Sequence, residues 1–100
     1  MSTTDVTIDE KVKVVITEPR RWKVILLNDD TTPMEFVIQI LTEVFKHTES
    51  AAKDIMLQVH ETGSGVAGIY SFEIAEAKAV EATNQSRTAG FPLQIKLEEE

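Results

Sequence analysis

The sequence lacks cysteine, so it can form neither a disulfide framework nor a thiolate site. This absence suits a reducing cytosol, although it fits other compartments as well. No apolar stretch approaches ~20 residues, so we expect no membrane-spanning helix. The segment Met1 to Glu10 is polar and acidic and has no apolar run behind a basic start, which indicates neither a secretory signal nor a transit peptide.

Basic residues are also scarce. The 100 residues include ten Lys and Arg against seventeen Asp and Glu, which gives a net charge of -7. No dense Lys/Arg patch is available to neutralise phosphates, so we expect neither nucleic acid nor an anionic membrane as a partner. A cationic partner fits this charge better.

A chain of this length with 42% hydrophobic residues suffices for one domain with one modest core. We predict that residues 1–20 form a flexible tail and that residues 21–98 form the folded domain. The alternation Val12-Lys13-Val14 leaves a second interpretation open, in which Lys11 to Ile16 is an edge strand.

The apolar run Trp22 to Leu27 predicts a buried strand, which ends at Asn28-Asp29-Asp30. Thr32-Pro33-Met34-Glu35 then has the pattern of a capping box, with Thr32 as the N-cap and Pro33 in the first helical position. Apolar residues at spacings of three and four predict that this helix runs to about Lys46.

Thr48 is the expected N-cap of a second helix, and Gly63 is its expected left-handed end. His60 follows Met56 by four residues, which predicts that it lies on the inner face of this helix. The apolar stripe of that face is Ala52, Ile55, Met56 and Val59.

Val66 to Tyr70 predicts a short strand, and Ser71 can cap a third helix. The inner face of that helix is predicted to consist of Phe72, Ala75, Ala79 and Ala82. Alternating Leu93, Ile95 and Leu97 predict a last strand, and Glu98 to Glu100 a solvated end. The order strand, helix, helix, strand, helix, strand predicts an α+β fold, a two-layer sandwich of three helices against a three-stranded, mainly antiparallel sheet.

The polar cluster Asn28-Asp29-Asp30 is the most informative candidate site. It joins a strand end to a helix start and therefore projects short polar side chains beside apolar Met34 and Val37. The residues alone favour an Asx turn for Asn and Asp at such a position, and they favour a satisfied core histidine for His60.

Catalytic and metal sites find little support. Asp29, His60 and Ser64 could be imagined as a hydrolytic triad, but Ser64 lies between two glycines at a helix end, without a strand-to-helix elbow. The same Gly63-Ser64-Gly65 lacks the lysine of a phosphate-binding loop. His47 and His60 do not have metal-ligand spacing on one helix face.

Leu26-Leu27-Asn28-Asp29-Asp30, followed by Thr32-Pro33-Met34-Glu35-Phe36-Val37, resembles the hallmark segment of the ClpS adaptor family. Ile55 to His60, Ile74 to Lys78 and Pro92-Leu93 resemble later segments of that family in the same order. The similarity covers about Trp22 to Leu97.

The resemblance implies a cytoplasmic adaptor that is not an enzyme and needs no cofactor or metal. Such an adaptor binds polypeptides that begin with a large residue, Leu, Phe, Tyr or Trp, which is called an N-degron. It then delivers them to a Clp AAA+ unfoldase and its protease for degradation.

The resemblance also implies roles for particular residues. The α-ammonium group would be bound by Asn28, Asp29 and His60, which offer an amide oxygen, a carboxylate and a neutral ring nitrogen. Docking on the N-terminal domain of the unfoldase would use Glu73 and Lys78. The hydrophobic pocket for the first side chain would be lined by Leu26, Thr32, Met34, Val37, Met56, Val59 and Leu93.

Two departures from the family pattern affect the rim of this pocket. Thr31 stands where the family often has an aromatic residue, and Thr88-Ala89-Gly90-Phe91 replaces a more polar approach to the last strand. The alternative function is a protein-interaction domain whose acidic surface binds a partner without reading chain ends.

Overall fold

The computed structural model describes residues 20–100. The predicted tail, residues 1–20, and the alternative strand at Lys11 to Ile16 therefore lie outside the described residues, apart from Arg20. The elements are β1 (Arg21–Leu27), α1 (Met34–Glu43), α2 (Glu49–Thr62), β2 (Ser64–Ser71), α3 (Phe72–Thr88) and β3 (Gln94–Glu99). This order confirms the predicted succession of strands and helices.

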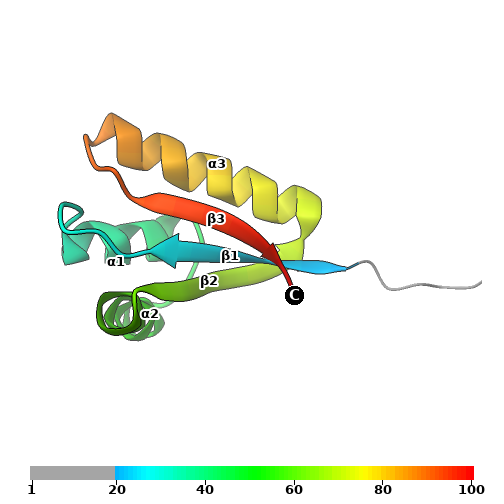
Figure 1. Cartoon of the computed structure of the whole chain (residues 1–100), viewed down its shortest axis with the longest axis horizontal. Helices are drawn as coiled ribbons and strands as arrows, with labels where there is room; N and C mark the ends of the chain where they lie inside the picture. Colours follow the sequence, from blue (N-terminus) through cyan, green and yellow to red (C-terminus); the bar gives the residue numbers. More distant parts are fainter. Residues whose placement is uncertain (1–19) are drawn as a thin grey trace, which may run out of the picture.

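The three strands form one antiparallel sheet in the order β2-β1-β3. Figure 1 shows the strands side by side, with α1 and α2 behind them and α3 running along the β3 side in that view. The register pairs Val24 with Leu97 and Leu26 with Ile95, so these four side chains share one face of the sheet. The predicted two-layer α+β fold is confirmed.

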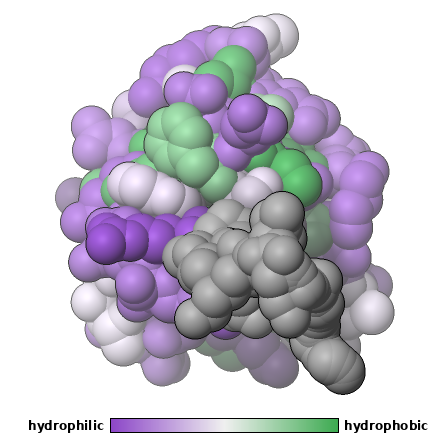
Figure 2. Space-filling model, turned by 90° about the vertical axis from the view of Figure 1, so that its right-hand side faces the viewer, coloured by the Kyte–Doolittle hydropathy of each residue, from purple (hydrophilic) through white to green (hydrophobic). Residues whose placement is uncertain are grey.

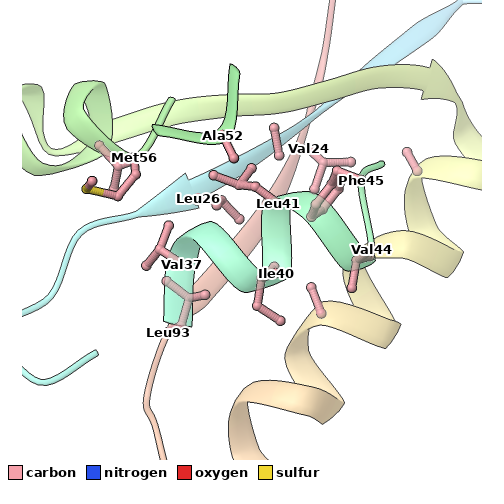
Figure 3. Packing of buried hydrophobic residues seen from close by; sticks show 14 residues of the cluster. Val24, Leu26, Val37, Ile40, Leu41, Val44, Phe45, Ala52, Met56 and Leu93 are labelled. Carbon is pink, nitrogen blue, oxygen red and sulfur yellow. The ribbon is translucent and has the colours of Figure 1, made fainter. Parts of the chain in front are cut away.

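The hydrophobic core lies between that face and the helices. Val24 and Leu26 are completely buried there, together with Ile40 and Leu41 of α1. Figure 3 shows these side chains with Met56 of α2 and with Leu93, which immediately precedes β3. In Figure 3, Leu41 of α1 lies beside Val24 and Leu26 of β1. Helix α2 packs on α1 and β2, and α3 packs on all three strands.

The predicted capping box of α1 is wrong. The N-cap position is occupied by Pro33, without a side-chain hydrogen bond, and the helix begins at Met34. The Thr32 hydroxyl instead donates to Asp29 Oδ2 at 2.8 Å. The helix also ends at Glu43, earlier than predicted, because the chain turns at Lys46, which has a left-handed φ of 63°.

The ends of α2 match the prediction. The Thr48 hydroxyl accepts a hydrogen bond from the Ala51 amide, and Gly63 adopts φ 94° and donates to the Val59 carbonyl. Since only glycine takes this left-handed conformation without steric cost, Gly63 lets the chain reverse directly into β2.

The third helix differs from the prediction at its start. Ser71 occupies the N-cap position without a capping hydrogen bond, and Phe72 is 43% exposed and packs edge-on against Trp22. Ala75 and Ala82 are buried as predicted, and Ser86 continues their face, fully buried, by donating to the Ala82 carbonyl. Figure 2 views the molecule from the end at which α3 begins and shows hydrophobic groups at the surface among hydrophilic ones.

The acidic end of the chain was predicted to be only a solvated end, but it belongs largely to the sheet. β3 extends to Glu99, and Glu99 and Glu100 form ion pairs with Arg20 and Arg21 at 2.7 and 2.8 Å. These pairs are exposed, so each contributes little stability.

Candidate functional site

The segment between β1 and α1 lies against the end of α2. At its start the Asn28 amide donates to the Gly63 carbonyl at 2.9 Å, which continues the pairing of Leu27 with Ser64. Asn28 therefore lies close to the last turn of α2, which carries His60. Two polar residues 32 positions apart in the numbering are brought together by this junction.

Asp29 organises the same segment. Its Oδ1 accepts from the amides of Thr31 and Thr32 at 2.8 and 2.7 Å, and its Oδ2 accepts from the Thr32 hydroxyl. The Asx-turn interpretation of Asp29 is therefore correct in geometric terms. Partial burial raises the pKa of the Asp29 carboxyl, but the hydrogen bonds from Thr32 and Thr31 and the attraction of Arg87 outweigh it, and the pKa is lowered overall.

A pocket of about 440 Å³ opens beside this turn. Its apolar wall comes from Met34 and Val37 of α1 and from Met56 and Val59 of α2. Its polar side combines the segment after β1 with His60. The residues that line it are Asn28, Asp29, Asp30, Thr31, Thr32, Pro33, Met34, Val37, Met56, Val59 and His60.

Most of the residues predicted for the site line this pocket, but two do not. Leu26 and Leu93 are 0% and 1% exposed and belong to the core cluster, so they support the pocket from within without bordering it. Asp30 and Pro33 line the pocket and were not among the predicted site residues, and Thr31, which was expected only to affect the rim, lines it as well. The only signal for Asp30 and Pro33 in the sequence was their position between residues that were predicted.

His60 differs from its predicted environment. It is exposed, whereas Met56 and Val59, the neighbouring pocket residues of α2, are buried. His60 therefore lies at the pocket's surface on the last turn of the helix and not within an apolar face. The interpretation of His60 as a satisfied core histidine is wrong.

The departure at residues 88–91 has a structural explanation. Phe91 packs edge-on against Phe36 of α1, with ring centroids 4.9 Å apart. Arg87 donates to the carbonyls of Phe91 and Leu93 at 3.1 and 2.8 Å and so holds this segment against the end of α3. Nothing in the sequence marked Arg87 as a residue that also attracts the Asp29 carboxylate.

The two predicted docking residues lie in different environments. Glu73 is exposed in the first turn of α3. The Lys78 ammonium donates to the Val44 carbonyl at 2.8 Å and lies 5.5 Å from the centre of the Tyr70 ring. Because Val44 is the C-cap of α1, Lys78 places its positive charge at the negative end of that helix.

Within residues 20–100, no three His, Asp or Glu side chains lie together in a way that could hold a metal ion. No helix in the same range is long and apolar enough to cross a membrane.

The family model described as ATP-dependent Clp protease adaptor protein ClpS matches residues 17–96. The chain belongs to the ClpS family. Similar relatives are the ClpS adapter proteins of Deinococcus radiodurans, 47% identical over 83% of this chain and 74% of the relative, and of Campylobacter jejuni, 48% identical over 85% and 88%. The relatives of this ClpS chain are named as adapters of a protease, so the chain is an adaptor and not an enzyme.

A solved ClpS structure has the same fold. Agrobacterium tumefaciens ClpS2 bound to L-phenylalaninamide is 44% identical and superposes with a TM-score of 0.80 over 83% of this chain and 100% of that one. The ClpS resemblance of the hallmark segment is thus confirmed at the level of the family and of the fold.

The Asp29 turn predicts a pH-dependent stability. Because the pKa of Asp29 is lowered by folding, the ionised carboxylate stabilises the folded state fully above about pH 4, the ordinary aspartate value. This contribution is lost as the pH falls through the lower pKa of the folded state. We expect Asp29→Asn to lower the free energy of unfolding at pH 7 and to differ progressively less from the wild type below pH 4, measured by urea denaturation.

The neighbouring Asp30→Asn is the matched control, since Asp30 is exposed. At pH 7 and below pH 4 alike, this substitution should leave the free energy of unfolding within about 0.5 kcal/mol of the wild-type value. Equal effects of the two substitutions at pH 7 would contradict the role of the Asp29 carboxylate in the turn.

Proposed function

We propose that this ClpS chain binds polypeptides whose first residue is large and apolar or aromatic, and presents them to a Clp AAA+ unfoldase. The observation that carries the proposal is the pocket itself, in which hydrogen-bond acceptors border an apolar cavity of about 440 Å³. L-phenylalaninamide, bound by the Agrobacterium tumefaciens relative, has a free α-amino group and an aromatic side chain. It therefore resembles the first residue of a polypeptide.

The polar side of the pocket suits an ammonium group. Such a group has three donors and one positive charge, so it requires converging acceptors. The Asn28 side-chain oxygen and a His60 ring nitrogen supply acceptors. Asp29 already accepts three hydrogen bonds within the turn, so it contributes mainly its negative charge.

The apolar wall alone would not give useful affinity. Burying one Leu or Phe side chain contributes about 1.5–3 kcal/mol, which is less than the cost of association. The ammonium contacts must therefore supply the remainder. They also explain why a chain end is preferred, because an internal residue offers one amide N–H in place of a cation.

The decisive experiment compares a peptide that begins with Leu or Phe with its N-acetylated form. We expect fluorescence anisotropy to detect binding of the free peptide and a loss of at least about tenfold in affinity on acetylation, which removes the charge. A peptide that begins with Ser controls for the side chain. Equal binding of free and acetylated peptides would favour an acidic interaction domain that does not read chain ends.

His60 can be tested by substitution. It lines the polar side of the pocket and is exposed on the last turn of α2. We expect His60→Ala, which removes the ring nitrogen that would accept from the ammonium group, to lower the affinity for a peptide that begins with Leu or Phe by about tenfold in fluorescence anisotropy. An unchanged affinity would exclude His60 from the ammonium site.

Met34 is the proposed gate for the shape of the first side chain. It lines the pocket and is 42% exposed, so it borders the entrance. A β-branched Ile or Val would press its second γ-carbon against this side chain. We expect Met34→Ala to raise the affinity for peptides that begin with Ile or Val by about tenfold. Leu57 is an exposed residue of α2 outside the pocket, so Leu57→Ala should not change the affinity for these peptides. If Met34→Ala still fails to bind peptides that begin with Ile or Val, Met34 is not the gate.

For docking on the N-terminal domain of the unfoldase we propose Glu73 and Lys78. The intramolecular contacts of Lys78 predict that Lys78→Met lowers the free energy of unfolding by about 1–2 kcal/mol, whereas Glu73→Ala leaves it unchanged. Glu73→Ala should weaken unfoldase binding without altering peptide affinity, measured by calorimetry and anisotropy. Unchanged unfoldase binding would exclude Glu73 from the docking surface.

A further inference from the structure

The start of β2 packs directly on the end of α2. Figure 1 shows β2 following α2 after a sharp reversal, which is made by Gly63. Gly65, the second residue of β2, is buried against the helix. A Cβ atom on Gly65 would lie 2.8 Å from Val59 Cγ2 and 3.4 Å from the Ile55 carbonyl oxygen. The first distance is shorter than a van der Waals contact, so a side chain at position 65 would force a neighbour to move.

The neighbour that would move belongs to the pocket. Val59 lines the cavity and is only 3% exposed. As a β-branched residue in a helix it has essentially one favourable χ1 rotamer, so it cannot rotate away from β2. The helix backbone at Ile55 lies behind the same contact. Because Val59 also lines the cavity, a displacement of Val59 away from β2 changes the cavity wall.

We propose that Gly65 is a positioning residue that sets the width of the pocket through Val59, and thereby determines how large a first residue is accepted. The inference rests on the proposed function, because it concerns the selectivity of the same pocket. Gly65 does not touch the cavity itself. Because it has no side chain, Gly65 lets β2 approach α2 closely without displacing Val59 from the wall of the pocket.

Gly68 provides a matched control on the same strand. A Cβ atom there would collide with the Tyr70 hydroxyl oxygen, so alanine at position 68 also forces a neighbour to move. Tyr70 does not line the pocket but stacks with Phe45, at a centroid distance of 6.5 Å. Gly68→Ala therefore reports the strain of adding a methyl group to β2 without a change at the cavity.

The test measures affinity by fluorescence anisotropy for three peptides that differ only in their first residue, Leu, Phe or Trp. In Gly65→Ala we expect the ratio of Trp to Leu affinity to fall by about tenfold, with Phe between them, because the larger rings need the space that Val59 would occupy. In Gly68→Ala the ratio should remain that of the wild type. An unchanged ratio in Gly65→Ala, or an equal change in both variants, would overturn the proposal.

A second substitution keeps the test decisive if Gly65→Ala folds poorly. Val59→Ala removes the Cγ2 atom that the new methyl group would meet, so Gly65→Ala should lower the melting temperature less in a Val59→Ala background than in the wild type. The ratio of Trp to Leu affinity of the double variant should equal that of Val59→Ala alone. The same loss of melting temperature in both backgrounds would show that the two residues are not coupled and would overturn the proposal.

The outcome also separates this inference from the proposed function. A wild-type chain that binds none of the three peptides would remove the proposed function itself. If the wild type binds these peptides and Gly65→Ala has the same ratio of Trp to Leu affinity, only the role of Gly65 is excluded.

Discussion

The hydrogen bond from the Asn28 amide to the Gly63 carbonyl joins the end of β1 to the end of α2, and the candidate site is built around this junction. The left-handed φ of Gly63 allows α2 to end and β2 to begin without a loop. Without this sharp reversal, β2 could not pair with β1 while packing on the helix that precedes it. The same reversal holds His60 beside the polar segment that follows β1.

The pocket combines two chemistries that have opposite requirements. An apolar wall is most effective when water is excluded, whereas acceptors for an ammonium group must not be left buried and unpaired. The structure meets both by placing buried Met56 and Val59 beneath an exposed His60 and Asn28. The Asp29 carboxylate is held in place by its own backbone, so its charge stands beside the cavity at a fixed position.

Predictions from the sequence were most accurate where one short segment determines its own structure. The Thr48 cap and the Gly63 end of α2 are local interactions, and both occur as predicted. The capping box at Thr32 was wrong because a second local partner, Asp29, competes for the same hydroxyl, and a pattern of residue types does not show which bond is stronger. Ser71 was likewise located as a helix start, but its hydroxyl makes no capping hydrogen bond.

Sequence patterns were enough to assign the family, the order of strands and helices, and most of the residues that line the pocket, because these depend on local patterns and on one distinctive segment. The folded structure was needed to show that Leu26 and Leu93 lie in the core behind the pocket, and that Lys78 reaches the end of α1. It also decided that Gly65 lies against Val59. Periodicity indicates which face of an element is buried, but which atoms meet across two elements depends on how closely they pack, and that is a property of the whole fold.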